Sequence, residues 1–320
     1  MRCSSARWLL GLLSVAWIAT SASAVTMAWT LVGDPGNPAD TEVMDDGTTG
    51  YGSVPYSYLI GTYEVTNAQY VEFLNAIAAT DSNWVYTGWT GIAQLGVPGS
   101  FSYAVAPGTE QRPVAGVGPY SAMRFANWMQ NGQPTGAQDA TTTEDGAYTM
   151  AVASYTSEPR NPGATIFLPS ENEWYKAAYY DPALGVYHDF PGGPGIMGCS
   201  EPLPFPNRAN CYEDHNQSFN STDVGSYPES GSPYGTFDQG GNVAEWNEAL
   251  MTETGWVRGL RGGAFSKYGE NMRSSVRRNA YLESYREIGF RLATTVPEPD
   301  AGLLLTAGAL GLAVLRRARA

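Results

Sequence analysis

Two stretches in the first half of the chain repeat apolar residues at the spacing of an amphipathic helix. The first opens with Thr66 and Gln69, which are three residues apart as in a capping box. Its apolar stripe follows at Tyr70, Leu74, Ile77 and Ala78. The second stretch covers residues 120–129 and stops at Asn131-Gly132, with a stripe at Ala122, Phe125 and Met129. We predict a helix in each stretch.

A third helix is predicted after Leu168-Pro169, because Ser170 and Glu173 again have capping-box spacing. Its apolar stripe consists of Trp174, Ala177 and Ala178. The rest of the pattern favours short strands, for example at residues 58–63 and 289–293, separated by long loops with many of the 37 Gly and 21 Pro. Without an internal repeat or an interdomain linker, the pattern predicts one loop-rich domain.

The N-terminal segment has the features of an export signal. Arg2 and Arg7 precede an apolar run at residues 8–18, and Ala22-Ser23-Ala24 supplies small residues for cleavage. We predict a secretory signal peptide at residues 1–24.

The C-terminal segment also differs from the central part of the chain. Val296, Pro297, Glu298 and Pro299 precede a mostly apolar run at 301–315, which is followed by Arg316, Arg317 and Arg319. As a helix this run spans about 22 Å, which is less than the roughly 30 Å hydrocarbon core of a bilayer. The order of these features resembles the PEP-CTERM sorting signal of Gram-negative bacteria, which implies an exosortase-type processing enzyme as partner. An ordinary C-terminal anchor is the alternative.

These signals divide the chain into the signal peptide, a domain at residues 25–295 and a sorting signal at 296–320. They predict export to the periplasm, the outer surface or the extracellular matrix, with a transient inner-membrane anchor. Cys199 and Cys211 are then the cysteines of the exported domain, in an oxidising compartment, and we predict a disulfide between them. A zinc pair is disfavoured, because the chain has only two histidines to complete a site.

Charge excludes some classes of partner. Residues 25–295 contain 13 basic and 29 acidic residues, a formal net charge of −16. Such a surface is a poor partner for nucleic acid or anionic lipid and a good one for divalent cations. Contact with a membrane is expected only through the C-terminal sorting helix.

Six motifs resemble, in order, those of the formylglycine-generating enzyme (sulfatase-modifying factor) family. They lie at residues 60–67 (IGTYEVTN), 112–114 (RPV, before the Trp128 helix), 168–174 (LPSENEW), 240–246 (GGNVAEW), 260–263 (LRGG) and 288–291 (IGFR). The resemblance implies a single α+β domain, rich in loops and related to the C-type lectin fold.

Catalytic members of this family oxidise a substrate cysteine with two copper-binding cysteines of their own. The family pattern places both between the Arg-Gly-Gly motif and the arginine-rich segment before Gly-Phe-Arg. Here that interval, residues 264–273, contains no cysteine, and serine or lysine cannot replace soft thiolate ligands of Cu(I). We therefore expect neither copper nor aldehyde-generating chemistry. His188 and His215 are too few for a non-haem iron site, and helix capping explains the paired carboxylates Glu171 and Glu173.

One metal site of the family can be carried over. The resemblance implies calcium ligands at Asp238 and Glu245 through their side chains, and at Gly241 and Val243 through main-chain carbonyls. The alternative is a metal-free turn in which Glu245 pairs with an arginine such as Arg261. A second family calcium site, near residues 210–219, aligns too poorly to be assigned.

Two functions remain open. The first is a non-catalytic, exported binding or structural module that acts on polysaccharide or in the extracellular matrix, where some of the nine Trp and twenty Tyr would stack on sugars. The second is an enzyme of divergent, oxidoreductase-like chemistry in the same pocket, with Arg273, Arg277, Lys267 or Tyr268 as its reactive groups.

Overall fold

The computed structural model describes residues 24–88, 91–150, 158–213, 220–251, 257–281 and 285–296. The predicted signal peptide, His215 and the sorting signal after Val296 lie outside these ranges. The helices are α1 (Asn67–Ile77), α2 (Pro119–Gln130), α3 (Glu171–Tyr179) and the 3-10 helix η1 (Gly269–Met272). The strands are β1 (Trp29–Val32), β2 (Tyr58–Gly61), β3 (Ile92–Leu95), β4 (Ser102–Val105), β5 (Ile166–Phe167), β6 (Tyr180–Asp181), β7 (Val186–Tyr187), β8 (Gly198–Cys199), β9 (Arg208–Ala209), β10 (Ala244–Leu250), β11 (Val257–Arg261), β12 (Arg278–Tyr281), β13 (Ile288–Gly289) and β14 (Ala293–Thr295).

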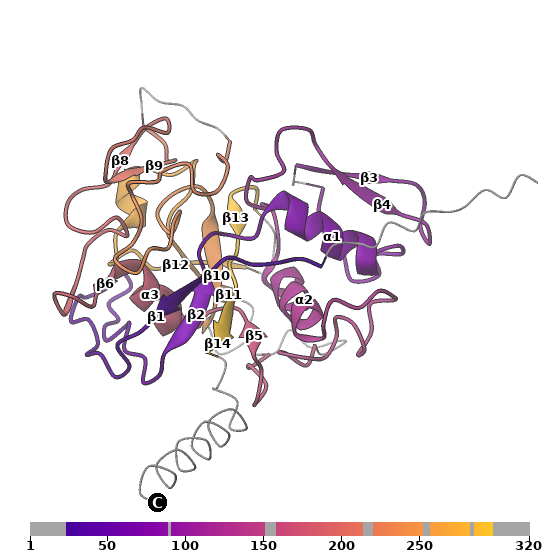
Figure 1. The fold of residues 1–320 in the computed structure, drawn as a ribbon, viewed down its shortest axis with the longest axis horizontal. Coiled ribbons are helices and arrows are strands. Elements are labelled where there is room, and N and C mark those ends of the chain that lie inside the picture. Colours follow the sequence, from indigo (N-terminus) through magenta and orange to yellow (C-terminus); the bar gives the residue numbers. More distant parts are fainter. Residues whose placement is uncertain are drawn as a thin grey trace, which may run out of the picture.

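Two four-stranded sheets form the centre of the fold (Figure 1). One has the order β1-β2-β14-β5 and is antiparallel, and the other has the order β12-β11-β10-β13, in which β10 and β13 are parallel. The chain leaves the second sheet after β13 and enters the first at β14. Residues 290–292 make this crossing and are fully buried. The predicted strand at residues 289–293 is therefore wrong in its middle, because the chain changes sheets there.

The three predicted helices are confirmed. Thr66 and Gln69 form both hydrogen bonds of a capping box on α1, and Ser170 and Glu173 do so on α3. α2 begins at Pro119, one residue before the predicted start, because proline is well tolerated in the first turn, where its missing N–H costs nothing. Local sequence thus fixed where these helices begin.

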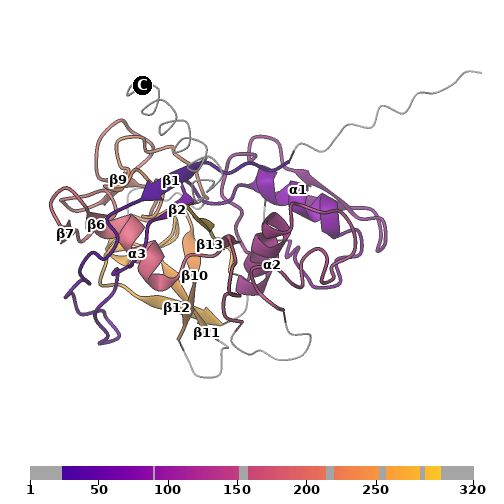
Figure 2. The ribbon, with the colours of Figure 1, turned by 60° about the horizontal axis from the view of Figure 1, so that its bottom comes forward.

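Aromatic side chains join the helices to the sheet crossing. Figures 1 and 2 show α1 and α2 side by side, beside the two sheets. Phe73 of α1 lies 5.3 Å from Phe125 of α2 between ring centroids, and Phe125 lies 5.5 Å from Phe290 in the crossing segment. Such edge-to-face pairs add stability beyond the burial of their area. The two sheets, α1 and α2 therefore share one hydrophobic core.

The fold class is confirmed as α+β with few helices and many loops. α3 packs on the sheet that contains β10. There the Trp174 indole donates a hydrogen bond of 2.7 Å to the Glu245 carboxylate of β10. Among the described residues, no helix has both the length and the apolar character that a membrane crossing requires.

Candidate functional site

The segment at residues 264–273 follows a sharp turn after β11. Gly262 and Gly263 have φ of +96° and +70°, which favour glycine. A Cβ on Gly262 would lie 2.8 Å from the main-chain oxygen of Gln239, so the close approach of the two loops also requires glycine. After this turn Ala264 and Phe265 are buried, whereas Lys267 and Tyr268 are exposed. The segment therefore presents polar side chains outward from an anchored base.

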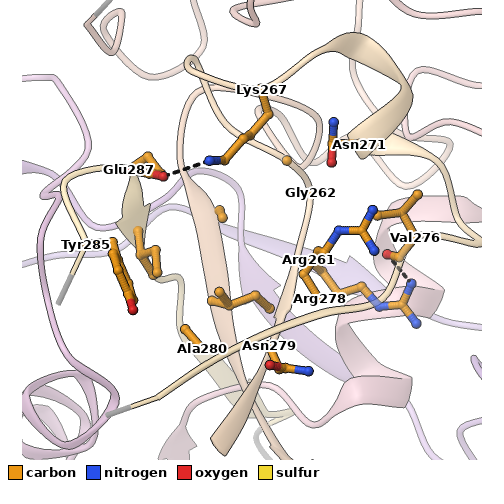
Figure 3. A pocket seen from close by; sticks show the side chains of 14 residues that line it. Arg261, Gly262, Lys267, Asn271, Val276, Arg278, Asn279, Ala280, Tyr285 and Glu287 are labelled. Carbon is orange, nitrogen blue, oxygen red and sulfur yellow. Dashed lines mark hydrogen bonds and ion pairs between the residues drawn. The ribbon is translucent and has the colours of Figure 1, made fainter. Parts of the chain in front are cut away.

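A cavity of about 540 Å³ lies over the second sheet, between this segment and β12 (Figure 3). Its lining includes Lys267 and Asn271 from the segment, Arg278 and Asn279 from β12, and Tyr285 before β13. Its volume falls within the range of small-molecule sites, about 300–1,000 Å³. Hydrogen-bonding groups and one aromatic ring therefore surround a space large enough for a small molecule or a sugar unit.

Ion pairs hold the charged groups at the rim of this cavity. The Lys267 ammonium lies 3.0 Å from the Glu287 carboxylate, and Arg278 pairs with Asp45 of an N-terminal loop. In Figure 3 the Lys267–Glu287 pair and Arg278 lie on different sides of the cavity. About half of each cationic side chain remains exposed, so both can reach a ligand.

Buried hydrogen bonds hold the floor of the cavity. The Arg261 guanidinium is buried and donates a 2.5 Å hydrogen bond to Glu171 at the start of α3. It also donates to the main-chain oxygens of Ser274 and Val276, which fixes the loop between η1 and β12. Glu171 also lies 3.4 Å from Arg277. Helix capping therefore explains Glu173 but not Glu171, which anchors the floor of the cavity.

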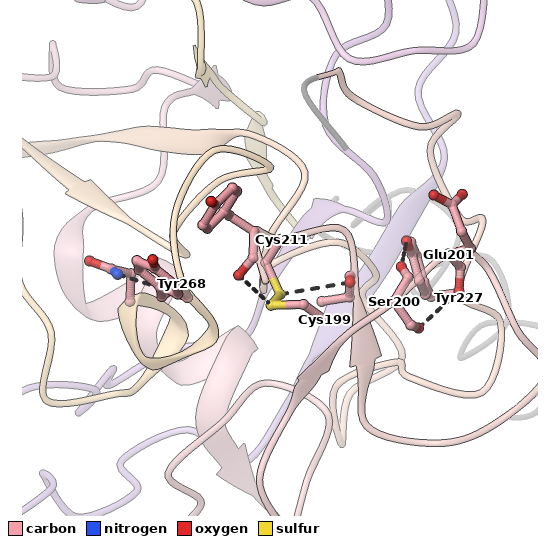
Figure 4. The surroundings of a disulfide bond; sticks show 9 residues. Cys199, Ser200, Glu201, Cys211, Tyr227 and Tyr268 are labelled. Atoms are coloured by element: carbon pink, nitrogen blue, oxygen red, sulfur yellow. Dashed lines mark hydrogen bonds between the residues drawn. A yellow bond between two sulfur atoms is a disulfide. The ribbon is translucent and has the colours of Figure 1, made fainter. Parts of the chain in front are cut away.

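A second hollow, of about 390 Å³, lies on the other side of η1. Tyr268 and Tyr212 contribute to its lining and stack edge to face, with ring centroids 4.9 Å apart. The predicted disulfide is confirmed at its edge, where Cys199 and Cys211 are joined with their Cα atoms 4.9 Å apart (Figure 4). The bond ties β8 to the segment that carries Tyr212.

Arg273 closes this second hollow. Its guanidinium lies 3.1 Å from the Asp189 carboxylate and 5.1 Å from the centre of the Phe190 ring. His188 lines a neighbouring, smaller hollow and forms a partly buried hydrogen bond of 3.3 Å with Asp181.

The predicted calcium turn has an unusual backbone. Asp238 and Asn242 have φ of 60° and 54°, and Gly241 has φ of 86°. A Cβ on Gly241 would lie 2.5 Å from the main-chain oxygen of Asn210, so the turn and that loop touch. Asp238 accepts a 2.6 Å hydrogen bond from the Gly225 N–H. Glycine at position 241 is therefore needed for this curled backbone, whether or not an ion binds.

Glu245 is paired with an arginine, but not with Arg261. Its two carboxylate oxygens each accept a 2.6 Å hydrogen bond from Arg291, which lies in the crossing between the sheets. Both side chains are fully buried. Glu245 and Arg261 face each other in the backbone register of β10 and β11, yet the Arg261 side chain goes to Glu171.

A third carboxyl group, that of Glu64, belongs to this buried cluster. Both its oxygens are buried without a hydrogen-bond partner among the described residues. Burial, reinforced by the charges of Asp238 and Glu245, raises the pKa of Glu64 well above its usual range. Burial also raises the pKa of Asp238, to about 6. Three carboxyl groups thus lie near one guanidinium, and the raised pKa values of Glu64 and Asp238 favour their neutral forms.

Comparison with known proteins decides the family. The profile of the "Sulfatase-modifying factor enzyme 1-like domain" matches residues 40–296. The chain belongs to this sulfatase-modifying factor family. A search of curated proteins found no match.

Solved structures show the same fold for this sulfatase-modifying factor domain. "Crystal Structure of CarF" matches with a TM-score of 0.57 and 19% identity, over 85% of this chain and 99% of that one. "Treponema denticola variable protein 1" matches with a TM-score of 0.51 and 19% identity, over 86% and 98%. "Structure of PvdO from Pseudomonas aeruginosa" matches with a TM-score of 0.49 and 18% identity, over 84% and 94%. At such identities the first two matches show the fold alone.

The sequence motifs of this sulfatase-modifying factor domain did not reveal that one segment is basic. Residues 261–286 contain six basic and two acidic side chains, whereas the remainder of 25–295 contains seven basic and 27 acidic ones. A count of charge in short windows would have found this segment, which lines both hollows.

Proposed function

We propose that this chain is an exported, non-catalytic binding domain of the sulfatase-modifying factor family, and that it binds an extracellular polysaccharide in the 540 Å³ cavity. One observation carries the proposal. The segment at residues 264–273, where the family places its copper-binding thiols, contributes Lys267 and Asn271 to the cavity and contains no cysteine. Polar and cationic groups bind and orient a ligand, but they cannot hold Cu(I) as thiolates do.

The surroundings of the cavity support a sugar as ligand. Tyr285 offers an aromatic face, 43% exposed, of the kind that stacks on sugar rings. Asn271 and Asn279 add amide groups that both donate and accept hydrogen bonds, as sugar hydroxyls do.

The proposal includes the route of export. The N-terminal signal would direct secretion, and the C-terminal Pro-Glu-Pro segment would be processed by an exosortase-type enzyme. The domain would then act at the cell surface or in the extracellular matrix. Its acidic surface excludes nucleic acid as the main partner, and only the sorting helix would contact a membrane.

A structural calcium ion is also part of the proposal. Asp238 and Glu245 would hold it by their side chains, with the carbonyls of Gly241 and Val243. Calcium would supply positive charge beside the buried carboxyl groups of Glu64 and Asp238, whereas Glu245 is already paired with Arg291. Within the described ranges, no three His, Cys, Asp or Glu side chains converge on one point, so main-chain oxygens are essential to this site.

Two assays on the exported protein test the function. The protein, incubated with copper and a cysteine-containing sulfatase-type peptide, should form no aldehyde detectable by hydrazide capture. It should be retarded in affinity electrophoresis through gels that contain polysaccharide. Aldehyde formation, or binding to no polysaccharide of any charge, would contradict the proposal.

The alternative is an enzyme of divergent chemistry in the same place. Of its candidate groups, Arg277 is held by Asp46 at 2.9 Å and lies 3.4 Å from Glu171, and Lys267 is paired with Glu287. Such ion pairs are typical of positioning and binding groups. The aldehyde assay separates the two functions.

A further inference from the structure

Three exposed cationic side chains line the two hollows. Arg278 and Lys267 stand at the first hollow and Arg273 at the second, with side chains that are 55%, 49% and 42% exposed. They belong to the basic segment of an otherwise acidic protein. The positive charge therefore gathers where the hollows are.

One short segment forms the wall between the hollows. Lys267 and Asn271 line the first hollow, whereas Tyr268, Glu270 and Arg273 line the second. Tyr268 is half-exposed on this wall, next to Lys267. A ligand longer than one hollow would cross the wall over an ammonium group and an aromatic ring, which suits a charged sugar chain.

The three cations already have partners that a ligand can replace. Each pairs with a carboxylate that is itself partly or largely exposed: Glu287 for Lys267, Asp45 for Arg278 and Asp189 for Arg273. Exposed ion pairs contribute little to stability, so exchanging a protein carboxylate for a ligand carboxylate costs little. The site is therefore chemically matched to carboxylate groups.

We propose that the ligand is an acidic, uronate-containing polysaccharide whose chain runs from the first hollow across the Lys267–Tyr268 wall into the second. The inference rests on the proposed function and names its ligand class and its path. Lys267 and Arg278 hold carboxylates in the first hollow, and Arg273 holds one in the second.

A nucleic acid is a poorer occupant of the same surface. Binding to a phosphate backbone depends on many cations that release condensed counterions. Here three cations are paired with three carboxylates, on an exported domain with a formal net charge of −16. A sugar chain offers hydroxyl groups that donate hydrogen bonds to these carboxylates, whereas the phosphate oxygens of a DNA backbone only accept.

The test compares polygalacturonate with the same polymer after its carboxyl groups are reduced to alcohols. Calorimetry in buffer without added calcium, which avoids calcium bridges, measures the exported protein with both polymers, with galacturonate oligomers of increasing length and with a short DNA duplex. Lys267→Gln and Arg273→Gln remove one cation from each hollow. Arg124→Gln on α2, away from both hollows, is the matched loss of one charge.

We expect polygalacturonate to bind more tightly than its reduced form, and affinity to rise with oligomer length. Each hollow variant should weaken binding by about tenfold, the effect of one charge-assisted hydrogen bond, and Arg124→Gln should not. Thermal unfolding of each variant would check that it is folded.

Other outcomes overturn the inference in distinguishable ways. If the reduced polymer binds as tightly as polygalacturonate, and the variants do not weaken that binding, the ligand is not acidic. The proposed binding function would still stand. Saturation with a single galacturonate, or an effect of Lys267→Gln alone, would contradict the path across the wall. Tighter binding of DNA would make the ligand a nucleic acid, and binding of no polymer would remove the proposed function itself.

Discussion

Individual buried carboxylates in this protein have sharply different environments. Glu173 accepts hydrogen bonds from Arg160, Tyr56 and the Ser170 N–H. Burial alone would raise the pKa of Glu173, but the hydrogen bonds and charge of Arg160 hold it below its usual value. Glu64, without hydrogen-bond partners among the described residues, has its pKa raised. Glu173 and Glu64 are both buried, so hydrogen-bond and ion-pair partners decide which of the two carboxyl groups has the lowered pKa.

We predict that Glu173→Gln lowers the free energy of unfolding at neutral pH by about 2 kcal/mol, because it removes one of the two carboxylates that pair with Arg160 while Glu248 remains. The folded-state pKa of Glu173 is depressed, so its contribution is present above the ordinary pKa of 4.5 and is lost as the pH falls through the folded value. The difference between wild type and variant in urea unfolding should therefore shrink below about pH 4. The exposed Glu72→Gln provides the control. A difference that is independent of pH would contradict this assignment.

Calcium binding can be tested at Asp238. Millimolar Ca²⁺ should raise the unfolding midpoint of the exported protein and chelator should lower it, because an ion bound only by the folded state stabilises it by about 2.7 kcal/mol at 100 times its Kd. Asp238→Asn should abolish this response and Glu72→Gln should keep it. Glu245 is a poor choice for mutation, because its loss would strand the buried Arg291.

If chelator leaves the wild-type midpoint unchanged, the turn at Gly240-Gly241 binds no calcium. The curled backbone would then serve only to bring Gly241 against the loop at Asn210.

Strands and loops depend on contacts that are distant in sequence. β8 and β9 are two residues each, and the disulfide joins Cys199 of β8 to Cys211, two residues after β9. A sheet this short is marginal without further support. The disulfide therefore supports the wall of the second hollow.

We expect the double variant Cys199→Ser, Cys211→Ser to lose about 2–3 kcal/mol of stability, because the unfolded chain regains the entropy of the open loop. Urea unfolding with and without reductant measures the effect. Reductant should destabilise the wild type and leave the double variant unchanged, and intact mass should show the loss of two hydrogens in the oxidised protein. Equal sensitivity of both proteins to reductant would contradict a stabilising bond.

The entire protein combines an acidic surface with one basic segment at the hollows. Net charge alone excludes nucleic acid and anionic lipid as general partners, but it conceals the six basic residues at 261–286. The position of the basic residues therefore predicts the ligand better than the net charge of the protein does.

The terminal signals lead to a prediction for the full chain. Expressed in a Gram-negative host that contains an exosortase, the protein should lose residues 1–24 and be cut near Pro297-Glu298-Pro299, as intact-mass analysis would show. Replacing Pro297 and Glu298 by alanine should leave the C-terminal segment in place. A wild-type product that keeps residues 316–320 would indicate an ordinary anchor.

Several features followed from the sequence because they depend on neighbouring residues. Capping boxes at Thr66 and Ser170 join groups three positions apart, so they were readable as patterns. Six ordered motifs were enough to identify the family and its fold. The missing thiols at residues 264–273 are also a fact of sequence.

Only the tertiary structure decided the pairings between distant groups. Glu245 could meet Arg261 across a strand pair, but the chain crosses between sheets at residues 290–292 and brings Arg291 to it instead. The same crossing interrupts the predicted strand at 289–293. The two hollows arise where a single segment passes between β12 and the disulfide loop. Such contacts depend on how the sheets pack, and no local spacing encodes them, because many arginines are chemically equivalent until the fold selects one.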